Sequence, residues 1–122
     1  MKVLLTGAAG FIGSAVADLL NERGYEVVGL DAWIPQAHAD DAAAADAADG
    51  KSRAGIRRID VRDAERLREE LADVDVVCHQ AAMVGAGLTP ADLPLYASHN
   101  DLGTAVLLAE MARAGVRKLV LA

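Results

Sequence analysis

The sequence predicts an α/β domain with a parallel β-sheet that helices cover on both faces. Two observations favour this fold class. Short apolar runs, typical of buried strands, alternate along the chain with segments whose apolar residues have helical spacing. Hydrophobic residues make up 53% of the 122 residues, which is enough for the core of one domain. The alternation favours a parallel sheet, because consecutive parallel strands are joined by a crossover that is usually a helix.

The first strand, helix and second strand form one βαβ unit, whose crossover should be right-handed. Residues 3–6 are an apolar run that ends at Gly7, which predicts a buried strand. Gly24 follows a helical pattern and is expected to take the left-handed conformation that ends many helices. Residues 26–30 predict the second strand, which Asp31 closes. The apolar face of the intervening helix consists of Ile12, Val16, Leu19 and Leu20.

The same alternation continues through the rest of the chain. Pro94 in the first turn of a long helix and Gly115 beyond its end are residues favoured at those two places. Residues 36–50, rich in Ala and Asp, predict a flexible surface excursion with nascent helix. The further predicted elements are a strand at 56–61, a helix at 64–71, a strand at 74–78, a loop at 80–93, a helix at 94–113 and a strand at 119–122.

Charge and cysteine content exclude several classes of protein. The net charge is −6 and no basic stripe is present, so we expect neither a nucleic acid nor an anionic membrane as partner. Every apolar run is far shorter than the ~20 residues of a membrane span, and residues 3–5 are too few for the core of a signal peptide. Cys78 is the single cysteine, which excludes an internal disulfide and fits a reducing compartment. We therefore expect a cytoplasmic, globular protein.

A glycine-rich segment joins the first predicted strand to the first helix, with the spacing G-x-x-G-x-x-G. Phosphate groups bind at such a junction because backbone N–H groups and the positive end of the helix dipole point at them. Gly7 permits the tight turn, Gly10 permits close approach of a pyrophosphate, and Gly13 permits close packing of helix and strand. The alternative is that the glycines serve only tight packing.

Asp31 closes the second strand, at a position suited to the two ribose hydroxyls of an adenosine. An enzyme that uses NADP would need an arginine nearby for the 2′-phosphate, and residues 32–36 contain none. The sequence therefore favours NAD. The alternative is a solvated carboxylate at the end of a strand.

Four motifs in order resemble those of extended short-chain dehydrogenases/reductases, in the NAD-dependent epimerase/dehydratase family. They are the glycine loop with Thr6, Asp60-Val61-Arg62-Asp63 after the third strand, His79-Gln80-Ala81-Ala82 after the fourth, and Asn100-Asp101-Leu102-Gly103-Thr104 on the following helix. The resemblance covers the chain apart from about residues 36–55. Residues 79–122 are most similar to those of sugar-nucleotide 4-epimerases.

The resemblance implies a Rossmann-type, doubly wound sheet of five parallel strands in the order 3-2-1-4-5. It implies that Asp60 binds the adenine amino group, beside the Val61 backbone, unless Asp60 is only a turn or helix-cap residue. It also implies that Asn100 supports the active-site strand, unless it is a polar residue of the helix surface, whereas we expect His79 to be structural. The residues expected to form the NAD site are Gly7, Gly10, Phe11, Ile12, Gly13, Asp31, Asp60, Val61, Ala81, Ala82 and Asn100.

The resemblance further implies that the full-length parent takes a sugar nucleotide and forms a homodimer. Family members carry a catalytic Ser or Thr and a Tyr-x-x-x-Lys motif, but Tyr25 and Tyr96 are followed four residues on by Gly29 and Asn100. We therefore predict no catalytic or metal-binding residue in this chain, and expect either a fragment that stops after the fifth strand or a truncated gene product.

Three functions remain open from the sequence. The chain is the NAD-binding part of a sugar-nucleotide epimerase or dehydratase, or of an oxidoreductase for a non-sugar substrate, or it is a non-catalytic nucleotide-binding or regulatory protein. A glycine loop also binds the adenosyl group of some methyl donors, but the motifs at Asp60 and Asn100 argue against that reading.

Overall fold

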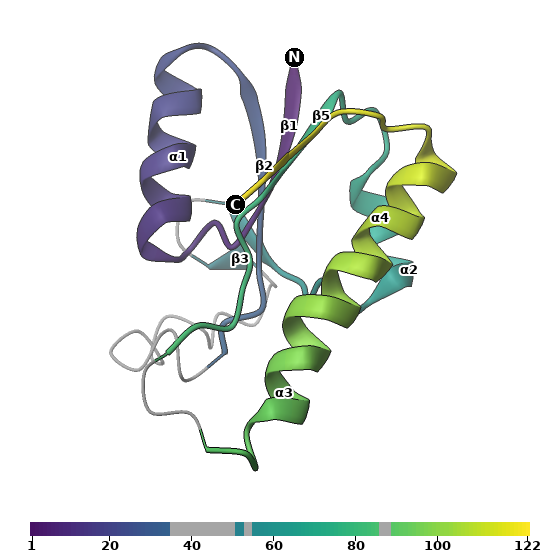
Figure 1. Ribbon diagram of the computed structural model, residues 1–122. Coiled ribbons are helices and arrows are strands. Elements are labelled where there is room, and N and C mark those ends of the chain that lie inside the picture. The colour runs from purple at the N-terminus through teal and green to yellow at the C-terminus, as the bar shows by residue number, and fades with distance from the viewer. Residues whose placement is uncertain (35–50, 53–54, 86–88) are drawn as a thin grey trace.

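The computed structural model describes residues 1–34, 51–52, 55–85 and 89–122. Within these residues, six strands form one sheet in the order β3-β4-β2-β1-β5-β6 (Figure 1). Five of them are mutually parallel and follow one another in space as the predicted order 3-2-1-4-5, which confirms the fold class. The parallel strands are β1 (Lys2–Thr6), β2 (Glu26–Asp31), β4 (Ile56–Arg58), β5 (Val76–His79) and β6 (Leu119–Leu121).

The sixth strand, β3 (Lys51–Ser52), pairs antiparallel with β4 at the edge of the sheet and was not predicted. A two-residue strand has no run of apolar residues that would mark it in the sequence. The strand predicted at 56–61 ends at Arg58, because the register pairs Arg58 with Asp31, the last residue of β2. The segment predicted at 36–50 lies outside the described residues.

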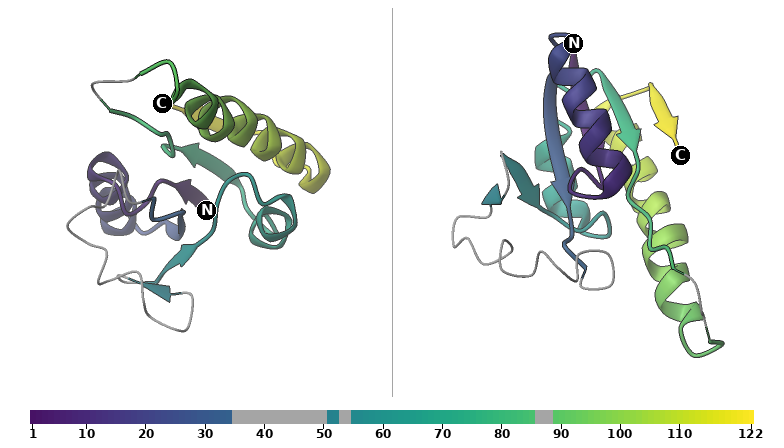
Figure 2. Two further views of the ribbon diagram at one scale, coloured as in Figure 1. Left: turned by 90° about the horizontal axis from the view of Figure 1, so that it is seen from below. Right: turned by 90° about the vertical axis from the view of Figure 1, so that its left-hand side faces the viewer.

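Helices cover the two faces of the sheet (Figures 1 and 2). Helix α1 (Phe11–Glu22) lies on one face, and α2 (Ala64–Glu70) and α4 (Gly103–Ala114) lie on the other. The alternation of β1 supplies both cores, since Leu4 packs in the core of one face and Val3 and Leu5 pack in the core of the other. The larger core consists of Leu4, Leu30, Ile59, Leu67, Leu71, Val74, Val77, Leu107, Met111 and Val116.

The long helix predicted at 94–113 has an internal irregularity. It begins as α3 (Leu93–Ala97), continues as a π-helical turn η2 (Ser98–Leu102) and then as α4. A wider turn changes the direction of the side chains it carries, and such turns are frequent at functional sites. Both predicted glycine caps are confirmed, with φ of 78° at Gly24 and 74° at Gly115. No helix in the described part of the chain is long and apolar enough to cross a membrane.

Candidate functional site

A cleft of about 450 Å³ lies at the carboxyl end of the central strands. Strand β1 has β2 on one side and β5 on the other. The strands that follow β2 lie farther out on its side of the sheet, and β6 lies farther out beyond β5. In open parallel sheets, ligands bind at this point, where the strand order reverses. The cleft is lined by Gly7, Gly10, Phe11, Ile12, Gly13, Leu30, Asp31, Ala32, Ile34, Ile59, Asp60, Val61, Gln80, Ala81, Ala82, Met83, Val84 and His99.

The glycine loop packs tightly on its inner side and is open toward the cleft. A Cβ at Gly7 would lie 2.7 Å from the Ala81 nitrogen, and one at Gly13 would lie 1.9 Å from the Gly7 oxygen. Gly10 differs, because its φ of −72° suits any residue and a Cβ there would lie 3.3 Å from the Gly7 oxygen, a tight contact but a much milder one than at Gly7 or Gly13. Packing therefore explains the glycines at 7 and 13, while the space beside Gly10 belongs to the cleft.

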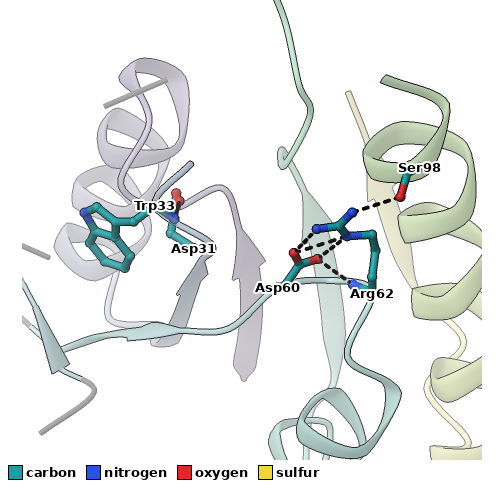
Figure 3. A network of polar contacts seen from close by, with 5 residues as sticks. All are labelled: Asp31, Trp33, Asp60, Arg62 and Ser98. Carbon is teal, nitrogen blue, oxygen red and sulfur yellow. Dashed lines mark hydrogen bonds and ion pairs between the residues drawn. The ribbon is translucent and has the colours of Figure 1, made fainter. Parts of the chain in front are cut away.

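Asp31 is held in place by backbone donors. Its Oδ2 accepts a hydrogen bond of 3.0 Å from the Ala9 N–H, and its Oδ1 accepts one of 2.9 Å from the Trp33 N–H. The residue is 7% exposed, so the alternative of a solvated strand-end carboxylate is wrong. Trp33 has a φ of 49°, an unusual conformation for a bulky residue, and this conformation accompanies its bond to Asp31. Both residues appear in Figure 3.

Asp60 is bound by the side chain and the backbone of Arg62 (Figure 3). The Arg62 N–H donates to Oδ1 at 2.9 Å, and Nη2 donates to Oδ2 at 2.6 Å. The side-chain hydrogen bonds from Arg62 hold the pKa of Asp60 below its ordinary value, against the opposing effect of burial. Asp60 thus takes part in a turn and also lines the cleft, while the cap of α2 is Asp63, which accepts from the Arg66 N–H.

His79 lies at the end of β5 between two threonines, and it is 3% exposed. Its Nδ1 lies 2.6 Å from Thr6 Oγ1, and its Nε2 lies 3.0 Å from Thr104 Oγ1 on α4. Thr6 Oγ1 also accepts the Ala81 N–H at 3.1 Å. Burial lowers the pKa of His79, which favours the neutral imidazole. This arrangement agrees with the structural role predicted for His79.

Asn100 differs from the other predicted site residues, because it is absent from the lining of the cleft. Its Oδ1 accepts the Met83 N–H at 2.7 Å and its Nδ2 donates to the Met83 carbonyl at 3.0 Å. Met83 itself lines the cleft. Asn100 therefore acts on the site through the backbone of the segment after β5, in line with the supporting role that the resemblance implied.

The other predicted site residues all line the cleft. Sequence reasoning missed several lining residues: Leu30, Ala32, Ile34, Ile59, Gln80, Met83, Val84 and His99. Most of them directly precede or follow a predicted residue at the end of a strand, which is the signal that would have found them. His99 instead directly precedes Asn100, a predicted residue on the helix, and belongs to the π-helical turn. Among the described residues, no group of three or more His, Cys, Asp or Glu could hold a metal ion.

The geometry of this cleft agrees with comparisons of the whole chain. Residues 3–122 match the model of the NAD dependent epimerase/dehydratase family. The chain belongs to this family. It is 41% identical over 123 aligned residues to a UDP-glucose 4-epimerase of Mycolicibacterium smegmatis, and the match covers 98% of this chain and 37% of that enzyme.

Solved structures of family members have the same fold. A UDP-glucose 4-epimerase from Stenotrophomonas maltophila, with bound NAD and formylated UDP-arabinopyranose, has a TM-score of 0.80 and 31% identity over 99% of this chain. A dTDP-glucose 4,6-dehydratase from Streptomyces venezuelae with bound NAD has a TM-score of 0.77 and 32% identity over 98% of this chain. The chain spans only 36% and 38% of these two proteins. It is homologous to their N-terminal, NAD-binding part.

Proposed function

We propose that this chain binds NAD in the cleft beside β1 and is the cofactor-binding part of a sugar-nucleotide epimerase or dehydratase. The observation that carries the proposal is the junction of β1 and α1. There a twelve-residue helix begins at the cleft, with Gly10 as its N-cap and no acidic residue in its first turn. Its free N–H groups and dipole favour a phosphate, and Gly10 leaves the space that a pyrophosphate needs.

The residues of the cleft fit the parts of NAD. Asp31 would accept the ribose hydroxyls of the adenosine, and Asp60 and Val61 would border the adenine. Ala81 and Ala82 would lie along the nicotinamide half, where small side chains leave room for the cofactor. NAD, when bound, supplies a hydride acceptor. The chain's own residues bind and orient it, and Asn100 fixes the backbone of Met83 beside it.

Substrate, assembly and compartment are proposals for the whole protein. The names of the relatives support a sugar nucleotide as substrate, since they are a UDP-glucose 4-epimerase and a dTDP-glucose 4,6-dehydratase. We further propose a homodimer and a cytoplasmic location. The DNA after codon 122 would test the enzyme reading directly, because a continuing frame with Tyr-x-x-x-Lys supports it and a stop supports a non-catalytic NAD-binding protein.

The proposal for this chain is tested by calorimetric titration of the purified 122-residue protein with NAD. We expect saturable binding of one NAD per chain, and no detectable binding by Gly10→Val, whose side chain would fill the pyrophosphate space. Trp33 is the only tryptophan and adjoins Asp31, so its fluorescence should respond to NAD in the wild type alone. A folded wild-type chain that binds no NAD would refute the proposal.

A further inference from the structure

Arg62 joins a residue of the cleft to the helix beside it. Asp60 lines the cleft, whereas Arg62 does not. The Arg62 guanidinium binds Asp60 through Nε and Nη2, and its Nη1 donates to Ser98 Oγ at 2.8 Å. Figure 3 shows Arg62 between the two, with Ser98 on the helix. Ser98 is the first residue of the π-helical turn, and the next residue, His99, lines the cleft.

The hydrogen bonds from Arg62 use most of the acceptor capacity of Asp60. A carboxylate has about four lone-pair sites, two on each oxygen. Oδ1 accepts the Arg62 backbone N–H at 2.9 Å and Nε at 2.9 Å. Oδ2 accepts Nη2 at 2.6 Å and shares Nε at 3.1 Å. The acceptor capacity that remains for a ligand is therefore on Oδ2, with its direction fixed by the planar guanidinium.

We propose that Arg62 is a positioning residue that makes Asp60 select an amino-bearing base over an oxo-bearing one. The inference rests on the proposed function, since the base is the adenine of NAD. One fixed, ionised acceptor matches a single N–H donor, such as the exocyclic amino group of adenine. The same acceptor repels a carbonyl oxygen at that position, as in hypoxanthine. Without Arg62, Asp60 would be free to rotate or to take up a proton, and the selection would weaken.

The charges around Asp60 agree with this role. Arg62 hydrogen bonds are the main cause that lowers the pKa of Asp60, and His99 on the π-helical turn lowers it further when charged. The Asp60 side chain is 30% exposed, so a ligand can reach it. Arg62 thus keeps the carboxylate ionised and oriented without entering the cleft itself.

The test compares NAD with nicotinamide hypoxanthine dinucleotide, which carries an oxo group where NAD has the amino group. Calorimetric affinities for both are measured on wild type and on Arg62→Met. The matched control is Arg57→Met, which breaks the ion pair of Arg57 with Glu70 outside the cleft. We expect wild type and Arg57→Met to prefer NAD, and Arg62→Met to lose about 5- to 20-fold in NAD affinity with little change for the hypoxanthine analogue.

Each outcome bears on a different claim. Equal losses for both dinucleotides in Arg62→Met would show a merely structural role, and an unchanged preference would show no role, so either result overturns the inference. A wild type that binds both equally also overturns it while leaving the proposed function intact. A folded wild type that binds neither refutes the proposed function itself.

Two further variants and a pH series keep the test decisive if Arg62→Met does not fold. Arg62→Lys keeps the charge but not the planar pair of donors, and Ser98→Ala releases the far end of Arg62. Both should reduce the preference for NAD partway, and a full preference in both would overturn the inference. In the Arg62 variants, the preference should also fade at a higher pH than in wild type as the solution is acidified, because Asp60 then takes up its proton sooner.

Discussion

Asn100 binds both backbone polar groups of Met83, its Oδ1 accepting the N–H at 2.7 Å and its Nδ2 donating to the carbonyl at 3.0 Å. An asparagine amide pairs with one peptide in this way only if both residues are held in a fixed relation. Asn100 and His99 both belong to the π-helical turn: Asn100 binds the segment after β5, and His99, one residue earlier, lines the cleft.

Asn100→Ala should destabilise the chain, because it leaves the Met83 N–H and carbonyl without these partners. We expect the free energy of unfolding to fall by about 1–3 kcal/mol for the two hydrogen bonds. Urea unfolding measures it, and NAD affinity should fall with it, since Met83 lines the cleft. Asp101→Ala, on the exposed side of the same turn, is the control and should change neither quantity. Equal effects of the two variants would contradict this account.

Substitutions at Gly10 and Gly13 should have different effects, the first on NAD binding and the second on folding. Gly13→Ala places a Cβ 1.9 Å from the Gly7 oxygen, so the backbone must move and the chain should lose much of its stability. At Gly10 an added Cβ has one close contact, 3.3 Å from the Gly7 oxygen, and the φ is one that valine tolerates, so Gly10→Val should lower the melting temperature far less than Gly13→Ala does. Its NAD binding should nevertheless disappear. The prediction fails if Gly10→Val unfolds, or if Gly13→Ala melts as wild type does.

His79 should make stability depend on pH in a definite direction. Burial lowers its pKa from the ordinary value of 6.5, so the unfolded chain takes up a proton at a higher pH than the folded chain does. The contribution of neutral His79 to the free energy of unfolding is therefore fully present above about pH 6.5. It falls as the pH drops toward the lowered pKa of the folded state. Asp60 contributes in the same sense, but only near and below its ordinary value of 3.8.

His79→Gln tests this by urea unfolding between about pH 7 and pH 5. It should lower stability at every pH, because the bonds to Thr6 and Thr104 change, yet its stability should vary less with pH than that of wild type. His99→Gln is the comparison variant: burial also lowers the pKa of His99, but His99 is only half-buried, so this variant should remove a smaller part of the pH dependence than His79→Gln does. A pH dependence in His79→Gln equal to that of wild type would show that His79 is not the group responsible.

The fold was predictable from local signals, and the irregularities were not. Strand β1, helix α1 and the caps at Gly24 and Gly115 follow from apolar spacing and from glycine conformation, both of which act over a few residues. The two-residue strand β3 and the π-helical turn depend on neighbours distant in sequence. No periodicity of apolar residues encodes them, so a single sequence does not reveal them.

The site was predictable to the extent that it consists of residues at strand ends. Asp31 is the last residue of β2 and Asp60 lies two residues after β4, and the sequence predicted both in the site. The sequence indicated Arg62 only as part of a motif. Its hydrogen bonds to Asp60 depend on the turn that the chain makes after β4. Ser98 completes that contact from 36 residues away, which no local pattern could indicate.

Asp31 should decide the choice between NAD and NADP. A carboxylate that accepts ribose hydroxyls forms charge-assisted hydrogen bonds, so Asp31→Ala should weaken NAD binding by about 1–3 kcal/mol, or roughly 5- to 150-fold. The same carboxylate repels a 2′-phosphate, and its removal should weaken NADP binding far less or even improve it. Calorimetric titration of wild type and variant with both cofactors measures the two changes.

In the structure, Asp31→Ala should also affect the glycine loop. The ratio of the NAD and NADP affinities separates this effect from the loss of the bonds to the ribose. Asp31 also accepts the N–H groups of Ala9 and Trp33, so Asp31→Ala leaves both without this partner and loosens the glycine loop. That loss weakens NAD and NADP alike, because both carry the same pyrophosphate. The loss of the charge next to the ribose, in contrast, weakens NAD more than NADP and so changes their ratio. If the affinities for NAD and NADP both fall and their ratio stays the same, Asp31 stabilises the loop and does not bind the ribose.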